Sequence, residues 1–154
     1  MSLEKITSPF NARHWIGDME ADYVYTLGVA GERFFKELKK GKIMGAKCKC
    51  CNVIYLPPRM YCEKCFAKLE QWVDIGKKGV IHTFTVATID VDGSKLEKPV
   101  TYALIRFEGV HGGLIHKIGE TDKVSIGMKV EAVLKPPRQR KASINDIAYF
   151  KPAK

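Results

Sequence analysis

No apolar run in the 154-residue sequence approaches the roughly 18–20 residues that a membrane-spanning helix needs. The first residues also lack the basic and then apolar arrangement of a signal peptide. Only five cysteines are present, four of them in pairs separated by two residues, and this usage suits a reducing compartment better than a disulfide framework. These absences predict a cytoplasmic protein without a membrane partner.

The sequence also lacks a recognisable catalytic constellation. It contains no Gly-x-Ser-x-Gly motif, no phosphate-binding glycine loop and no paired carboxylates. No two histidines are spaced as a ligand or acid–base pair, and His82, which alternates with Val80 and Phe84, is predicted to be a hydrogen-bonded core residue. The sequence therefore does not support an enzymatic activity of its own.

What is present is a globular composition with an excess of positive charge. Hydrophobic residues make up 45% of the chain and charged residues 28%, which excludes a disordered protein. The formal net charge of +9 suits nucleic acid, an acidic protein surface or a phosphorylated small molecule as a partner. Charge alone does not choose among these three classes.

The most specific motif is a pair of cysteine knuckles with identical spacing. Two Cys-x-x-Cys turns close a tetrahedral site of four sulfurs, so a structural metal ion is predicted on Cys48, Cys51, Cys62 and Cys65. Zinc is the default metal, and iron is the alternative that such a site also accepts. Cys50 has no partner at this spacing and is predicted to be a bystander.

The chain divides into three predicted parts. Residues 1–43 form an N-terminal arm and helical segment, and residues 44–69 form a zinc ribbon that is too short to bury a core without its metal. Residues 70–154 form an OB-fold domain. The predicted fold class is mixed α and β, with N-terminal helices, a rubredoxin-like zinc ribbon and a C-terminal five-stranded OB-fold barrel.

Helical spacing of apolar residues runs from Asp18 to about Lys40 and ends at Gly41. Glycine in a helix interior costs roughly 1 kcal/mol, so two short helices with a break near Gly28 are an alternative to one long helix. The later part of the chain reads as strands because β-branched runs alternate with glycine-containing turns. Five strands in the order of an OB-fold are predicted at Gly79–Asp90, Val100–Phe107, Leu114–Lys117, Met128–Lys135 and Ser143–Phe150.

A basic stretch from Lys135 to Lys141 lies between the last two predicted strands. In an OB-fold this connection commonly lines the ligand face. Both a phosphate clamp and a solvated basic loop agree with its composition.

Motifs around the knuckles resemble those of a known family. The matching residues between the knuckles are Tyr55, Pro57, Pro58 and Arg59. The matching pieces of the predicted barrel are Gly79-Val80 and residues 126–130. Over about residues 20–150 the chain thereby resembles the acyl-CoA-associated OB-fold proteins with a rubredoxin-like zinc ribbon.

The sequence departs from that pattern at the residue after each second cysteine. Rubredoxin-like knuckles usually have glycine there, whereas this chain has Asn52 and Phe66. Asparagine tolerates the left-handed conformation that this position favours, and phenylalanine adopts it less easily.

The resemblance implies an accessory or scaffold subunit that is not itself an enzyme. Its partner would be a thiolase-like or hydroxymethylglutaryl-CoA synthase-like enzyme, with the N-terminal helices making the protein–protein contacts. Binding of acyl-CoA would account for the positive surface, because guanidinium and ammonium groups pair with phosphates. The candidate phosphate ligands are Arg59, Arg138, Arg140 and Lys141.

The alternative is a nucleic-acid-binding protein, since OB-folds and zinc ribbons both serve that function. Single-strand binders interleave aromatic and basic residues on the second and third strands of the barrel. Here Tyr102 and Arg106 share one face of the second strand, but the third strand, Leu114–Lys117, contains no aromatic residue. The scaffold hypothesis is therefore favoured, and a rubredoxin-like electron carrier or an undetected enzyme is a further alternative.

Overall fold

The computed structural model describes residues 25–90, 92–121 and 123–153, so the predicted arm and the first part of the predicted helical segment lie outside it. The ribbon elements and the helix before them are α1 (Gly28–Lys39), β1 (Met44–Lys47), β2 (Ile54–Leu56) and β3 (Gln71–Asp74). The remaining elements are β4 (Lys78–Ile89), β5 (Lys95–Arg106), β6 (Val110–Gly112), β7 (Leu114–Lys117), β8 (Lys129–Leu134), η2 (Pro137–Gln139), η3 (Ile144–Asp146) and β9 (Ile147–Pro152).

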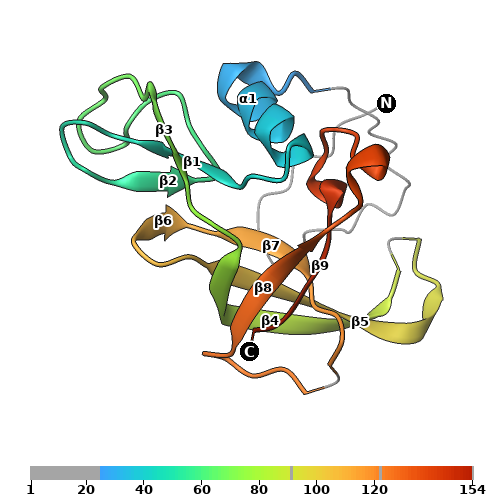
Figure 1. Cartoon of the computed structure of the whole chain (residues 1–154). Coiled ribbons are helices and arrows are strands. Elements are labelled where there is room, and N and C mark those ends of the chain that lie inside the picture. Colours follow the sequence, from blue (N-terminus) through green and yellow to red (C-terminus); the bar gives the residue numbers. More distant parts are fainter. Residues whose placement is uncertain (1–24, 91, 122, 154) are drawn as a thin grey trace, which may run out of the picture.

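The strands form two sheets, with α1 packed above them (Figure 1). The smaller sheet has the order β3-β1-β2-β6 and the larger one the order β7-β5-β4-β8-β9. Within the part of the chain that the structure describes, no helix is long and apolar enough to cross a membrane.

A single α-helix stands where a helical segment is predicted. Gly28 is its first residue and has a φ of 63°, a left-handed conformation that separates the helix from the residues before it. The helix ends as predicted, with Lys40 as its C-cap and the N–H of Gly41 donating to Leu38 O at 2.8 Å. The prediction of a helix pair is thus corrected to one α-helix in the described residues, and residues 18–24 lie outside them.

The larger sheet has the predicted five strands but is not a closed barrel. Among the described residues, the pairing of its two edge strands, β7 and β9, is limited to a parallel bridge between Ile118 and Phe150, where the N–H of Gly119 donates to Phe150 O at 2.8 Å. The predicted barrel is therefore an open OB-fold sheet with a seam between β7 and β9.

The last predicted strand is wrong at its beginning. Ser143 starts a capping box, and the segment after it is the 3-10 helix η3. The buried carboxylate of Asp146 accepts hydrogen bonds from the backbone N–H groups of Lys141, Ala142 and Ser143 at 2.8, 2.9 and 3.3 Å. Because these donors are satisfied by one side chain, the segment turns and does not extend until β9 begins at Ile147.

The prediction of a buried His82 is also wrong. Gly79 and Ile81 are the buried residues of β4, whereas Val80, His82 and Phe84 are exposed. Alternate residues of a strand face opposite sides, so an inward Ile81 places His82 outward. The histidine that the fold buries is His116 on β7.

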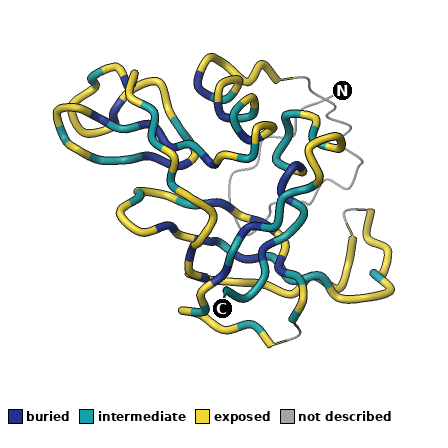
Figure 2. Tube along the Cα trace, in the orientation of Figure 1, coloured by how far each residue is buried: buried dark blue, intermediate teal, exposed yellow. Residues whose placement is uncertain are grey.

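One apolar core joins the helix to the larger sheet. Phe34 and Leu38 of α1 belong to the same buried cluster as Ile81, Ile105 and Phe150. Figure 2 shows this buried centre and the exposed hairpin of β4 and β5 that projects from it. The ribbon has a separate small cluster of buried residues, formed by Ala46, Cys48, Tyr55, Cys62 and Leu69.

The ribbon and the larger sheet are joined at β6, which pairs in parallel with β2. The N–H of Gly113 donates to Leu56 O at 2.9 Å. At Gly112, where φ is 96°, an added Cβ would lie 2.0 Å from the same carbonyl oxygen. Only glycine therefore permits this close approach of the two backbones.

We expect Gly112→Ala to lower the free energy of unfolding by roughly 3 kcal/mol, because the methyl group would push β6 away from β2. Gly109→Ala is the matched control: its φ of 68° is also positive, but no atom lies within 4 Å of an added Cβ. The control should lose only about 1 kcal/mol. Chemical denaturation measures both values, and equal losses would contradict the steric role of Gly112.

Candidate metal centre

The two cysteine knuckles have the same backbone geometry. The N–H of Cys48 donates to Val53 O at 2.8 Å, and the N–H of Cys62 donates to Ala67 O at 2.9 Å. Asn52 and Phe66, which follow the second cysteines, have φ values of 56° and 57°. Phenylalanine therefore adopts the left-handed conformation here despite its steric cost.

The four predicted ligands converge on one point. The Sγ atoms of Cys48, Cys51, Cys62 and Cys65 all lie within 4.8 Å of one another. The Sγ atoms of Cys48 and Cys65 are 3.5 Å apart, close to the roughly 3.8 Å that a tetrahedral ion with 2.3 Å bonds to sulfur requires. Cys50 is exposed and is not part of this group.

The side chain of Tyr55 stabilises the cluster from the ribbon core, a role that the sequence did not reveal. Its hydroxyl oxygen lies 3.2 Å from Cys62 Sγ. By donating to the thiolate, it lowers the pKa of the Cys62 thiol to about 6, and the same contact raises the pKa of Tyr55 to about 12. The thiolate is the form that binds metal ions, so the residues present fit such a group.

A metal ion held by four cysteines has a structural role. Zinc in such a set supplies cross-linking and has no coordination position left for a substrate. The first knuckle adds a hydrogen bond from the N–H of Cys51 to Cys48 Sγ at 3.4 Å. Cys48 and Cys62 are buried, whereas Cys65 is exposed, so the cluster lies at the edge of the ribbon.

The structure places the four predicted phosphate ligands on two separate elements. Arg138, Arg140 and Lys141 belong to the connection between β8 and β9, whereas Arg59 belongs to the ribbon. The Arg59 guanidinium pairs with the Glu63 carboxylate and lies 5.4 Å from the centroid of the Tyr55 ring.

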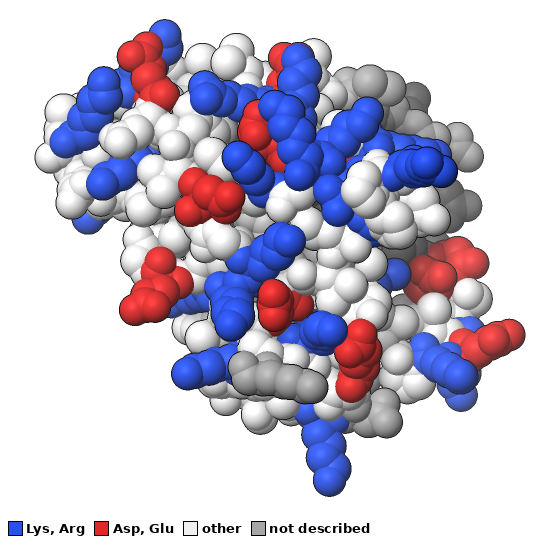
Figure 3. All heavy atoms as spheres, in the orientation of Figure 1, with Lys and Arg blue, Asp and Glu red and all other residues white. Residues whose placement is uncertain are grey.

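Arg140 fastens the basic connection to α1. Its Nε donates to Lys135 O at 2.7 Å, and its Nη1 donates to Lys39 O at 3.3 Å. The basic connection therefore lies against the C-terminal end of α1, whose last turn carries Lys36 and Lys39. Figure 3 shows Lys and Arg side chains gathered over this part of the surface.

A groove of about 290 Å³ lies between α1 and the ribbon. The Arg33 guanidinium lies 4.6 Å from the centroid of the Trp72 ring and forms part of this groove. Val29 of α1 and Met60 of the ribbon are exposed apolar residues of its lining. Arg59 also lines this groove, whereas no residue of the basic connection between β8 and β9 does.

These features define a zinc-ribbon protein with an appended OB-fold domain, and known proteins share both parts. Residues 35–70 match the family description "ChsH2, rubredoxin-like zinc ribbon domain", and residues 72–135 match "ChsH2, C-terminal OB-fold domain". A DUF35 domain-containing scaffold protein of Methanocaldococcus jannaschii is 30% identical over 97 residues, which cover 60% of this chain and 67% of that protein. A protein of the same description from Methanothermobacter thermautotrophicus is 29% identical and covers 63% and 74%.

Two solved structures share the fold. A DUF35-family protein of unknown function from Sulfolobus solfataricus is 42% identical, with a TM-score of 0.62 over 69% of this chain and 78% of that one. The Ltp2-ChsH2(DUF35) aldolase is 20% identical, with a TM-score of 0.59 over 78% and 91%, and this likeness supports the fold alone. The chain belongs to the ChsH2/DUF35 family.

We expect Cys48→Ser to remove stoichiometric metal and to destabilise the ribbon, because three thiolates and a hydroxyl bind zinc far less tightly than four thiolates. Cys50→Ser is the matched control and should keep one metal ion per chain. Plasma emission spectrometry of the purified proteins measures the metal content and distinguishes zinc from iron. Full metal content in Cys48→Ser with unchanged stability would contradict the assignment.

Proposed function

We propose that this chain is a non-catalytic scaffold subunit that binds a thiolase-like or related acyl-CoA enzyme. Membership of a family whose relatives are named scaffold proteins supports this function. The presence of a ChsH2 protein in an assembly described as an aldolase supports an enzyme as the partner. The bound ion would be zinc, held by the four cysteines of the ribbon.

The single observation that carries this proposal is the conformation and exposure of Phe66. A left-handed φ costs an L-residue other than glycine roughly 1–2 kcal/mol, and Phe66 adopts a φ of 57°. Its side chain is 79% exposed, so packing within the chain does not repay this cost. The knuckle turn imposes this conformation, as it does at Asn52, and the exposed ring that it leaves on the surface would be available for contact with another molecule.

Two exposed apolar side chains, Val29 and Met60, line the groove between α1 and the ribbon. Their chain neighbours on the outer side, Leu27 near Val29 and Tyr61 next to Met60, are exposed as well. Aromatic and apolar residues ringed by arginine are typical of the centre of a protein interface, and Arg33 and Arg59 line this groove. This surface would receive the enzyme partner, and α1 would supply one side of it.

The basic connection between β8 and β9 would contact the phosphates of acyl-CoA. Arg138 and Lys141 would do so directly. Two donors of Arg140 are already engaged by Lys135 O and Lys39 O, so its main contribution would be to hold the connection against α1. Arg59 lies on the ribbon, apart from Arg138 and Lys141. It would contact CoA only where the enzyme partner meets the ribbon.

We expect Phe66→Gly to stabilise the metal-loaded protein by about 1 kcal/mol, because glycine adopts the left-handed conformation without strain. The same change should weaken partner binding at least about tenfold through loss of the exposed ring. Chemical denaturation measures the first effect, and quantitative co-purification with the thiolase-like enzyme of the native host measures the second.

Asn52→Gly is the matched control for this experiment. Asn52 occupies the equivalent position of the first knuckle, with a φ of 56°. The control should gain less stability, because asparagine tolerates this conformation, and should bind the partner normally. If Phe66→Gly co-purified as much partner as the control does, Phe66 would not be a contact residue.

A further inference from the structure

The hairpin of β4 and β5 extends beyond the apolar core, and one side of it lacks a neighbouring strand in the part of the chain that the structure describes. β8 pairs with β4 at residues 78–80, and the backbone contacts on that side end at Ile81, whose N–H donates to Met128 O at 2.9 Å. Over residues 83–89, the described pairing of β4 is with β5 alone. Backbone groups alternate in direction along a strand, so about half of those in residues 83–89 point away from β5. We call this side of residues 83–89 the open edge of β4.

A β-bulge just after Ile81 determines which side chains of this segment face the core side of the sheet. Ile81 lies opposite Ile105, whereas Phe84, beyond the bulge, lies opposite Ala103. Ala103 and Ile105 are both buried and share one face of β5, because they are two residues apart. Phe84 therefore lies on the face that continues from the core, as does Val86, yet these two side chains are 37% and 50% exposed. The apolar face of the sheet thus continues past its own core.

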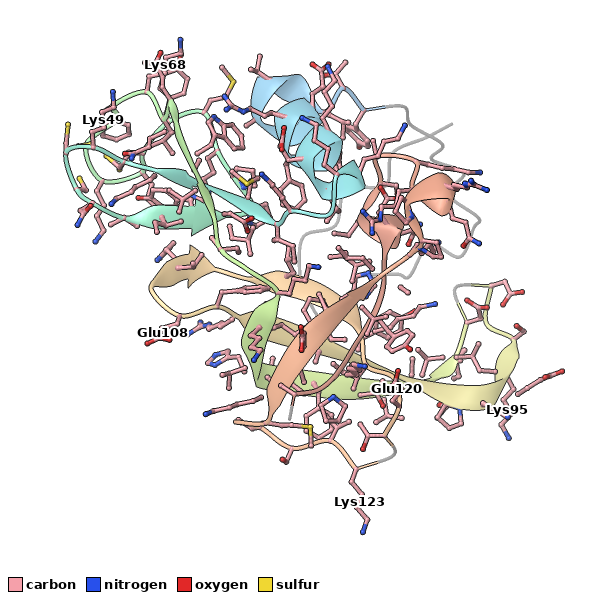
Figure 4. All side chains as sticks on the ribbon, viewed as in Figure 1. Lys49, Lys68, Lys95, Glu108, Glu120 and Lys123 are labelled. Atoms are coloured by element: carbon pink, nitrogen blue, oxygen red, sulfur yellow. The ribbon has the colours of Figure 1, made fainter. Side chains whose placement is uncertain are left out.

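The open edge also lacks the residues that normally prevent exposed strand edges from pairing. Its sequence, TFTVATI, contains no charged residue, no proline and no glycine. Soluble proteins usually protect such an edge with charged side chains or proline. The other edge of the same hairpin has this protection where β5 extends past β7, and Lys95 points outward there (Figure 4). The protecting residues of β5 are Lys95, Glu97, Lys98 and Pro99.

The sequence of the open edge is complementary to itself. If two copies paired antiparallel about a two-fold axis at Thr85, Thr85 would face its own counterpart. Phe84 of each copy would then face Val86 of the other. Threonine pairs and pairs of an aromatic with a β-branched residue are favourable across strands, and no like charges would meet. Such a two-fold contact is closed, because each copy uses the same edge.

Charge favours the same antiparallel orientation. Asp92 is exposed in the turn at the end of the hairpin, where its Oδ1 accepts a hydrogen bond from the N–H of Ser94 at 2.9 Å. Lys129 is exposed at the start of β8, opposite Val80 of β4. Antiparallel pairing would bring the turn of one copy beside the start of β8 in the other, so that Asp92 approaches Lys129. Parallel pairing would instead bring the two Asp92 carboxylates together.

We propose that the open edge of β4 joins two copies of this chain, so that their larger sheets become one continuous antiparallel sheet. Because the paired segment is short, the interface is small and the dimer is reversible. An extended segment of a different protein would find the same backbone groups but would not need a self-complementary order of side chains. The dimer goes beyond the scaffold function, because neither Phe66 nor the groove between α1 and the ribbon contributes to it.

Sedimentation velocity of the full-length, metal-loaded chain, from about 1 µM to about 1 mM, tests this proposal. The mass should rise with concentration from that of one chain toward that of two. Thr85→Lys should weaken dimerisation at least about tenfold, because two ammonium groups would face each other at the two-fold axis. Ile115→Lys is the matched control: Ile115 is also exposed but lies on β7, on the other side of β5, and this variant should dimerise normally. Thermal unfolding checks that both variants fold.

A disulfide tests the register of the pairing. Cys50→Ser first removes the exposed cysteine that lies outside the metal cluster. In that background, Thr85→Cys should form an intermolecular disulfide on mild oxidation, because residues that face each other at a two-fold axis are direct neighbours. Ile115→Cys in the same background should remain a monomer on a non-reducing gel.

Four results would overturn the proposal. The first two are a monomer at all concentrations, and equal dimerisation of the Thr85→Lys and Ile115→Lys variants. The third is protection of the amides of residues 83–89 from hydrogen exchange that does not depend on concentration, since the chain itself would then cover the edge. The fourth is protection that arises only when the enzyme partner is added. Phe66→Gly should dimerise normally, so failure of the scaffold proposal and failure of this dimer give different results.

Discussion

The cross-link that a metal ion would form among the four cysteine thiolates is the interaction on which the ribbon depends. Four sulfurs within 4.8 Å would repel one another as thiolates, and a bound divalent ion converts that repulsion into the main cross-link of the segment. Two of the five buried residues in the ribbon cluster, Cys48 and Cys62, are themselves ligands. The ribbon therefore has little apolar burial with which to fold alone. Its β2 in turn supports β6 of the chain beyond it, across the close contact at Gly112.

Features fixed by local sequence were predictable. The cysteine spacing, the end of α1 at Lys39 and Lys40, and the strands β4, β7 and β8 depend on neighbouring residues and on turns between them. The wrong predictions concern features that depend on contacts between residues distant in sequence, or on the hydrogen bonds of a single side chain. Asp146 turns the start of the last predicted strand into η3, and the inward position of Ile81 sends His82 outward. The pairing of β6 with β2 left no local signal, because it joins segments more than fifty residues apart.

The sequence predicted which residues would form the metal cluster. It did not predict which neighbouring side chains form hydrogen bonds to the cysteine sulfurs. The role of Tyr55 depends on the fold that brings its hydroxyl to Cys62. The basic residues show the same limit: their charges were evident, but the contact of Arg140 with the helix end, and the seam beside Lys117, exist only in three dimensions. The molecule has two distinct surfaces. An apolar one lines the groove between α1 and the ribbon, and a cationic one includes Lys117 and Lys135 of the larger sheet and its basic connection.

Hydrogen exchange of the backbone amides before and after removal of the metal by a chelator tests most directly whether the ion holds the ribbon. Metal analysis of the same samples establishes that the ion has left. We expect the amides of β1, β2 and β3 to lose their protection together. Those in the core of β4, β5, β8 and β9 should keep it, since that core has its own large apolar cluster. Unchanged protection of the ribbon strands in the metal-free protein would contradict it.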